Sequence, residues 1–516
     1  MSASTLQPVG QISPRRRFWV LAAALLALFL GALDTLIMSA AMPTIVADLG
    51  GMHLYSWVYS AYFLSRAISL PIFGKLADLY KVKTLFIVSI GMFLISSIMA
   101  GLSQTMSSLI IWRVFQGIGA GGNFALVYIA LAEISPGETR GKTLSLASVV
   151  WGIASLLGPS LGGIIVTFFS WRWIFFMNIP LGIFSLTGIS MHLIEFREKK
   201  REVFLDIAGS LTLSATVLSL LTTFIAGGSK YDWLSPPMAG LIGLTVVFAI
   251  LFYLAERRAK DPIIALGFFK NSGFRFGNAA VFFSSFAIFA LFAFAPVFIQ
   301  GVLKKSPMQV GVAMLSLSFG WSVGSLMLGY MINRIGQKKS AVGGAVLLVI
   351  GCGMTLVFSA ATTMATCFWV FMAAGLGMGF VTLSTLLIVQ SCVPVSDLGV
   401  ATASNQFART LGGSIGVGIC GGLLTMKLSA IMAALLPAGR LDPATLPATV
   451  QAQPSFEYFF RPEIQSLLAP AAQTALREAL RGGFFLLFCV VLAAALICLC
   501  FCLALPKSAS VSSAAQ

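Results

Sequence analysis

Residues 18–43 read FWVLAAALLALFLGALDTLIMSAAMP, and Asp34 is the single charged residue in this stretch. A helix of this length can cross a hydrocarbon core about 30 Å thick. A carboxylate near the centre of such a helix costs about 2.5–3.5 kcal/mol on insertion scales, so Asp34 requires an explanation. Two interpretations are open. Asp34 either fixes helix packing through a partner charge or water, or it binds an ion, a proton or a substrate.

The composition of the whole chain is that of a polytopic membrane protein. Of its 516 residues, 58% are hydrophobic and 10% are charged, and the mean hydropathy is +0.95. These values lie outside the range of soluble globular chains. The net charge of +16 does not indicate nucleic-acid binding, because the basic residues form short clusters between apolar spans. We therefore expect the lipid bilayer, and no nucleic acid, as a partner.

Segments of sufficient length and apolar character occur along the whole chain. They are residues 18–41, 55–74, 84–102, 108–132, 143–168, 173–194, 205–227, 236–255, 274–299, 309–332, 341–361, 364–390, 403–426 and 482–505. We therefore predict an all-α polytopic membrane protein with fourteen transmembrane helices.

The loops between these segments predict the orientation, because short cytoplasmic loops of membrane proteins collect Lys and Arg. Alternate short loops, beginning with the Arg15-Arg16-Arg17 cluster, hold most of the basic residues. The short loops on the other side contain only Arg172, Lys230, Lys304 and Lys305. We therefore expect a multi-pass protein of the cytoplasmic membrane with both termini in the cytoplasm.

The two halves of the chain share landmarks at an offset of about 255 residues, which indicates an internal repeat. Gly74 and Asp78 correspond to Gly329 and Asn333. Many secondary transporters consist of two such halves with a site between them. The predicted domains are an N-terminal six-helix half (1–203), an inserted helix pair (204–262) and a C-terminal six-helix half (263–516).

The segment between the last two predicted helices, 427–481, lies on the outer side in this topology. Its first part contains Pro437, Pro443, Pro447 and Pro454. Residues 464–480 then alternate apolar and charged positions with a helical period. We expect a partly helical outer hairpin, and a flexible insertion is the alternative.

Residues 74–83, GKLADLYKVK, connect the second and third predicted helices. They resemble the cytoplasmic loop signature of the major facilitator superfamily. The resemblance implies that Gly74 lets two helices approach and that Asp78 pairs with basic groups to latch one conformation. The match is partial, because the family has Arg, Gly and Arg where this chain has Leu79, Lys81 and Val82.

The predicted fifth helix carries a stripe of small residues and one proline. These residues are Gly152, Gly158, Pro159, Gly162 and Gly163. Small side chains let helix backbones meet closely, and proline bends a helix. The spacing resembles the antiporter motif of drug:proton exchangers. In that family the motif lies on the helix that seals and rocks against the other half. Together with Leu33-Asp34-Thr35 and residues 171–182, it resembles the fourteen-helix branch of drug:proton antiporters.

The predicted fourth helix contains residues 112–122, WRVFQGIGAGG. This run resembles the superfamily's helix 4 signature, in which the arginine, here Arg113, is linked to proton transfer. The second half has Trp369 at the corresponding position. We therefore expect the ionic chemistry in the first half.

Three further charged residues are candidates for coupling. Arg66 lies about mid-span in the second predicted helix, and we expect it to pair with Asp34; pointing into a cavity is the alternative. Asp206 and Glu133 lie near cytoplasmic helix ends, where capping or solvation is the commoner role and proton release is the alternative. His53 and His192 lie near helix ends and form no metal constellation.

The resemblance covers nearly the whole chain and implies a proton-coupled exporter of lipophilic, cationic drugs. An exporter of a specific metabolite, lipid or siderophore is the alternative on the same scaffold. The chain has no Gly-x-x-x-x-Gly-Lys-Ser/Thr phosphate loop, so we expect the proton gradient as the energy source and no cofactor.

The remaining expectations concern metals, catalysis and assembly. The eight cysteines lie in or beside apolar spans without metal-ligand spacing to His, so we expect no metal site. A membrane enzyme or scaffold is the rival class, and the sequence has no cluster of catalytic residue types at one membrane depth. We therefore expect a monomeric transporter, not an enzyme, with small-molecule drugs and protons as partners.

Overall fold

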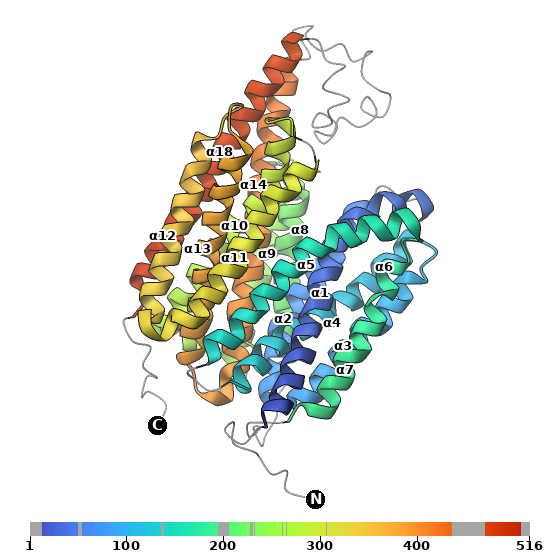
Figure 1. Cartoon of the computed structure of the whole chain (residues 1–516), viewed down its shortest axis with the longest axis vertical. Coiled ribbons are helices and arrows are strands. Elements are labelled where there is room, and N and C mark those ends of the chain that lie inside the picture. Colours follow the sequence, from blue (N-terminus) through green and yellow to red (C-terminus); the bar gives the residue numbers. More distant parts are fainter. Residues whose placement is uncertain are drawn as a thin grey trace, which may run out of the picture.

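The computed structural model describes residues 13–49, 54–135, 139–194, 206–227, 231, 233–260, 262–264, 266–305, 307–435 and 470–506. Within these residues the protein is helical and has no strand beyond one isolated bridge between Gly227 and Tyr231. The helices form an elongated bundle in which α1 begins and α18 ends at the same end, here named the terminal end (Figure 1). The predicted all-α class is confirmed.

Helices occur at every predicted segment. In the first half they are α1 (Pro14–Leu49), α2 (Tyr55–Leu79), α3 (Val82–Gly101), α4 (Met106–Glu133), α5 (Arg140–Phe168), α6 (Trp173–Phe176) and α7 (Asn178–His192). The inserted pair is α8 (Ile207–Ala226) and α9 (Pro236–Arg258). The remaining elements are η3 (Leu266–Lys270), α10 (Ser272–Gly301), α11 (Pro307–Ile335), α12 (Gln337–Met354), η4 (Thr355–Val357), α13 (Met364–Ser391), η5 (Val395–Asp397), α14 (Leu398–Leu435) and α18 (Pro470–Ala504).

Most of these helices are candidate membrane spans. Among the described residues, 12 helical segments are long and apolar enough to cross a membrane. The protein is therefore a multi-pass membrane protein, and the number fourteen stays a prediction. Of the predicted hairpin at 427–481, residues 436–469 lie outside the described residues.

Several helices begin at side chains that accept a hydrogen bond from the first turn. Thr105, Asp206, Asn271 and Thr363 cap α4, α8, α10 and α13 in this way. Such caps satisfy backbone N–H groups that have no partner within the helix. The caps explain why these helices start where they do.

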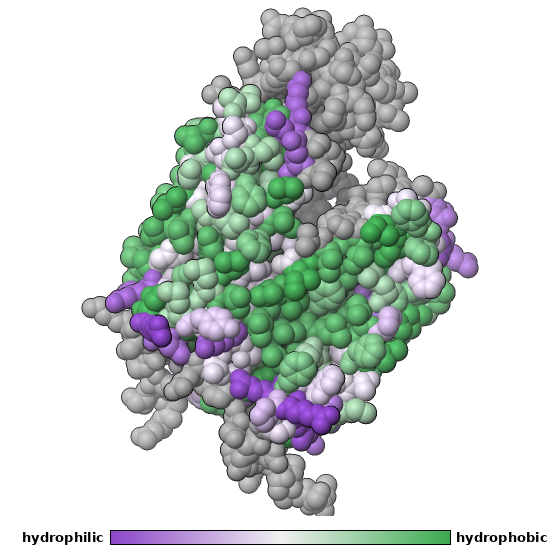
Figure 2. Space-filling model, in the orientation of Figure 1, coloured by the Kyte–Doolittle hydropathy of each residue, from purple (hydrophilic) through white to green (hydrophobic). Residues whose placement is uncertain are grey.

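Burial separates central helices from peripheral ones. The spans of α4 and α13 are 83% and 78% buried, whereas the span of α9 is only 6% buried. A hydrophobic helix with so little protein contact has lipid as its surroundings. Figure 2 shows hydrophobic residues across the middle of one face and hydrophilic residues mainly near the terminal end, as a membrane-embedded surface requires.

The two predicted halves contact each other at the terminal end. Gly74 on α2 lies against Ala403 on α14, and Gly141 on α5 lies near Gly329 on α11. Toward the opposite end, the helices of the two halves diverge (Figure 1). The structure therefore has one closed end and one end at which the halves separate.

Candidate functional site

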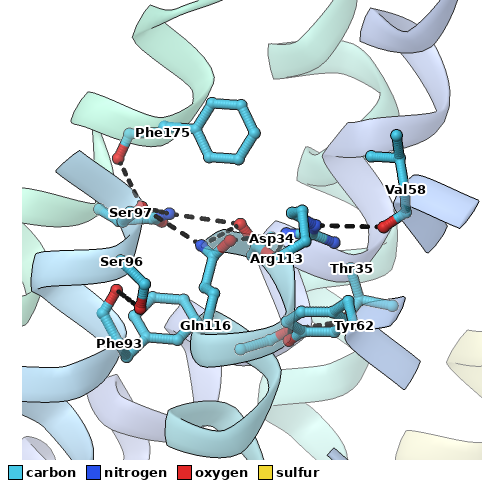
Figure 3. A network of polar contacts seen from close by, with 12 residues as sticks. Asp34, Thr35, Val58, Tyr62, Phe93, Ser96, Ser97, Arg113, Gln116 and Phe175 are labelled. Carbon is cyan, nitrogen blue, oxygen red and sulfur yellow. Dashed lines mark hydrogen bonds and ion pairs between the residues drawn. The ribbon is translucent and has the colours of Figure 1, made fainter. Parts of the chain in front are cut away.

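A buried ion pair joins α1 to α4 in the first half (Figure 3). Arg113 Nη1 donates to Asp34 Oδ2 at 2.6 Å, and the two side chains are 1% and 0% exposed. Arg113 also donates to Gln116 Oε1 at 2.8 Å and lies 4.1 Å from the ring centre of Tyr62. A buried pair tolerates its desolvation cost only when its geometry is good and further hydrogen bonds surround it. Both conditions are met here.

The other oxygen of Asp34 is held by amide groups. Gln116 Nε2 donates to Asp34 Oδ1 at 2.9 Å, and Asn178 Nδ2 donates to the same oxygen at 3.4 Å. Asn178 also donates to Ser97 Oγ at 2.9 Å, and Ser97 donates to the Phe175 carbonyl at 3.0 Å. The network thus connects α1, α3, α4, α6 and α7. A change of charge on Asp34 would therefore alter hydrogen bonds that join these helices.

The predicted pairing of Arg66 with Asp34 is wrong. The guanidinium of Arg66 lies 4.6 Å from the ring centre of Phe124 and 5.4 Å from that of Trp151. It donates a long hydrogen bond of 3.5 Å to Thr35 Oγ1. The physical reason is that the oxygens of Asp34 are already occupied by donors on α4 and α7. Arg66 instead packs against aromatic rings of α4 and α5.

Asp206 and Glu133 lie outside this network. Asp206 Oδ1 caps α8 by accepting from the Gly209 N–H at 2.7 Å. Glu133 is buried at the last residue of α4, about 30 Å along that helix from Arg113 at the usual rise per residue. The capping role considered for Asp206 is therefore observed, and neither acid contacts the Asp34 network.

Glu256, near the end of α9, is 3% exposed and was not predicted from the sequence. Its carboxylate accepts from the backbone N–H groups of Ile263 and Ile264, each at 3.2 Å. These bonds hold the segment after α9 against the helix. A buried acid whose partners are backbone groups leaves no pattern in the sequence.

Asp78 connects the two halves at the terminal end. Its carboxylate accepts from the backbone N–H of Gly399 at 2.9 Å and of Val400 at 2.8 Å. Both groups belong to the first turn of α14, where unsatisfied N–H groups and the helix dipole favour an anion. Gly74 allows the approach, because a Cβ there would overlap Ala403. The sequence resemblance implied basic partners for Asp78, and this helix N-terminus was not among the expected partners.

The glycines of α5 lie at two different interfaces. A Cβ at Gly152 would overlap the side chain of Ser322 on α11, in the other half. A Cβ at Gly158 would lie 2.7 Å from Cβ of Leu36 on α1. Since Leu36 is two residues after Asp34, α5 is packed closely against the helix that carries the buried acid.

The other three residues of this motif differ in how closely they are packed. Gly163 has no atom within 4 Å of an added Cβ, so its lack of a side chain is not required by packing. Gly162 is buried. Pro159 lies within α5, and its side chain is outside the described residues.

A second ion pair lies at the end of α1 that is far from the terminal end. Trp171 Nε1 and Arg172 Nη1 donate to Asp48 Oδ2 at 2.9 and 2.8 Å. These hydrogen bonds, with that from Trp171 first, lower the pKa of the Asp48 carboxyl below its usual value. The pair joins α1 to the start of α6 within one half, so it has no direct part in contacts between halves.

Arg409 on α14 is a further charged residue that the sequence analysis missed. Its guanidinium lies 5.0 Å from the ring centre of Phe124 and 5.8 Å from those of Tyr128 and Trp321. It is 8% exposed. An arginine inside a predicted span is itself a signal of function, so the rule applied to Asp34 would have identified it.

This architecture, with two helical halves around buried charges, is that of a membrane transporter. The family model described as Major Facilitator Superfamily matches residues 24–417. The chain belongs to the major facilitator superfamily, as its motifs predicted, and it is a transporter rather than an enzyme.

Two of the relatives carry names of multidrug proteins. The chain is 31% identical over 490 residues to multidrug transporter protein MdtP of Bacillus subtilis, covering 91% of this chain and 90% of that protein. It is 33% identical over 415 residues to multidrug resistance protein 3 of the same organism, covering 79% of each. The solved structure of human MFSD10 covers 93% of this chain and 100% of that one, with a TM-score of 0.58 and 14% identity, and shows the same fold.

Proposed function

We propose that this protein is a proton-coupled multidrug exporter, exchanging drugs for protons across the cytoplasmic membrane. The names of the relatives support multidrug transport, and a specific metabolite, lipid or siderophore exporter has no comparable support. The protein would work as a monomer with both termini in the cytoplasm, and the proton gradient would supply the energy without a cofactor.

The observation that carries the proposal is the buried pair between Asp34 and Arg113. Protonation of Asp34 removes the counter charge from a guanidinium that is 1% exposed. Breaking one side of a buried pair costs about 3–5 kcal/mol, because the remaining charge is uncompensated. The protonated and ionised forms therefore favour different helix arrangements, which is what coupling requires.

Helix packing connects Asp34 to the contact between the halves. Leu36 on α1 lies against Gly158 on α5. On the same helix, Ser148 Oγ donates to Ser325 Oγ on α11 at 2.9 Å. A shift of α1 on protonation of Asp34 would therefore move α5, which carries part of the seal. With the termini in the cytoplasm, the closed terminal end makes this an outward-facing arrangement.

The test is a proton-flux measurement on the full-length protein in proteoliposomes. Addition of a transported drug should release protons through the native protein, and Asp34→Asn should reduce this movement by about ten-fold or more, equivalent to about 1.4 kcal/mol in the barrier. Asp48→Asn is the matched control, because Asp48 also pairs with an arginine but lies outside the network. Native drug-driven proton movement in Asp34→Asn would refute the proposed role.

The charge of the substrate is a separate question. The sequence resemblance implied lipophilic cations, and this stays a prediction. A cation would be favoured by carboxylates or by aromatic faces in the space between the halves.

A further inference from the structure

Two arginines from different halves meet on one aromatic ring. Arg66 on α2 and Arg409 on α14 lie 4.6 and 5.0 Å from the ring centre of Phe124. They are 6% and 8% exposed. Like charges repel in a poorly hydrated interior, so this arrangement needs an opposite charge to be favourable.

Within the part of the chain that the structure describes, no carboxylate forms an ion pair with either arginine. The ion pairs found there are Asp34 with Arg113 and Asp48 with Arg172. From residue 262 to residue 435 the sequence contains a single acidic residue, Asp397, which lies in η5 at the start of α14. A cation between the halves would face two guanidiniums and find the nearby carboxylate of Asp34 already occupied.

The same region has buried donors without acceptors. Among the described residues, these include Arg66 Nε and the indole nitrogens of Trp151 and Trp321. The ring of Trp151 lies 5.4 Å from Arg66, and that of Trp321 lies 5.8 Å from Arg409. Buried polar groups in native proteins normally have partners, so a cluster of unsatisfied donors indicates that a ligand provides the acceptors.

We propose that the space around Phe124 binds the exported compound as an aromatic organic anion. Its carboxylate or similar acidic group would lie between Arg66 and Arg409, and its rings would stack on Phe124, Trp151 and Trp321. A guanidinium suits this ligand, because it binds a carboxylate through two parallel hydrogen bonds and stacks on aromatic faces. This names the substrate class of the exporter proposed above and rests on that proposal.

Binding requires the halves to rearrange around the ligand. The cavity beside Arg409, lined also by Tyr128 and Gln406, has a volume of about 10 Å³, enough for about one water molecule. Arg66 and Arg409 come from opposite halves. An anion between them therefore contributes to closure of the space that separates the halves.

The test compares two ligands that differ in charge but share one ring system. Binding of 2-naphthoate and of 2-naphthylmethylammonium to the full-length protein in lipid nanodiscs is measured by calorimetry without a gradient, with empty nanodiscs as the blank. The native protein should bind 2-naphthoate at least ten-fold more tightly than it binds 2-naphthylmethylammonium. Arg409→Gln and Arg66→Gln should each weaken its binding by about ten-fold or more, since one charge-assisted contact is lost.

Two controls separate ligand binding from structural support. Arg275→Gln is the matched control, because Arg275 is exposed and lies 4.7 Å from the ring centre of Phe276; it should bind 2-naphthoate like the native protein. Without ligand, Arg409→Gln should raise the thermal unfolding temperature, because it relieves repulsion between two buried charges. If Arg409 instead supports the fold, Arg409→Gln should lower that temperature.

Three outcomes would overturn the proposal. They are equal or tighter binding of the ammonium compound, no binding of 2-naphthoate, and binding of 2-naphthoate that neither arginine variant changes. These measurements involve no proton gradient. An exporter of neutral or cationic drugs would still show Asp34-dependent proton movement, so failure here is distinguishable from failure of the proposed function.

Discussion

Replacing Asp78 by Asn should open the terminal end. In the structure, the charged carboxylate accepts two backbone N–H groups of α14, from Gly399 at 2.9 Å and from Val400 at 2.8 Å. These bonds join α2 to α14 and therefore exist only while the halves are closed at this end. An asparagine of the same shape can accept one such bond through its amide oxygen but has no charge.

The magnitude follows from these two bonds. A hydrogen bond to a charged group contributes about 1.5–3 kcal/mol, against about 0.5–1.5 kcal/mol for a neutral one. Loss of charge at a helix N-terminus costs about 0.3–1 kcal/mol more. A total of about 2–3 kcal/mol would shift the equilibrium between closed and open forms by about 30- to 160-fold.

The assay measures alkylation of a cysteine that is buried in the closed form. The eight native cysteines are replaced, and Ser145→Cys is introduced. Ser145 is 0% exposed, and its Oγ would lie 2.7 Å from a Cβ on Gly329 of α11. Because alkylation requires separation of α5 from α11, its rate by N-ethylmaleimide reports the open population. Asp78→Asn should raise that rate by about 30-fold or more, the lower limit of the expected shift.

The control is Asp48→Asn, which removes a carboxylate that contacts only its own half through Trp171 and Arg172. This variant should alkylate at the rate of the cysteine-substituted parent. Equal rates for Asp78→Asn and the parent would refute the reasoning. Such a result would mean that contacts between α5 and α11 keep this end closed without the carboxylate.

Two further predictions concern packing and topology. Gly158→Ala should lower the transport rate by about ten-fold while the protein still reaches the membrane. The added Cβ would lie 2.7 Å from that of Leu36, and close helix contacts of this kind need small residues. Native transport in a well-expressed variant would contradict this prediction. Gly163→Ala, which meets no atom within 4 Å, should transport normally. A cysteine replacing Ala448 in a cysteine-free protein should react with an impermeant thiol reagent added outside intact cells, and labelling only after lysis would reverse the predicted topology.

The sequence was sufficient to locate the helices. Each of the fourteen predicted segments coincides with a helix, because an apolar stretch in lipid must satisfy its backbone hydrogen bonds internally. Asp34 and Arg113 could also be recognised singly, since a charge inside an apolar span is costly wherever its helix lies. These properties depend on residues that are close together along the chain.

The tertiary structure decided which charged groups meet. Arg66 was the expected partner of Asp34, but the orientation of α2 and α4 about their axes directs Arg113 toward it instead. Asp78 meets N–H groups that follow it by more than three hundred residues, at a helix end that carries no recognisable motif. Helix rotation and contacts between halves depend on the packing of the whole bundle at once, so no local pattern in the sequence encodes them.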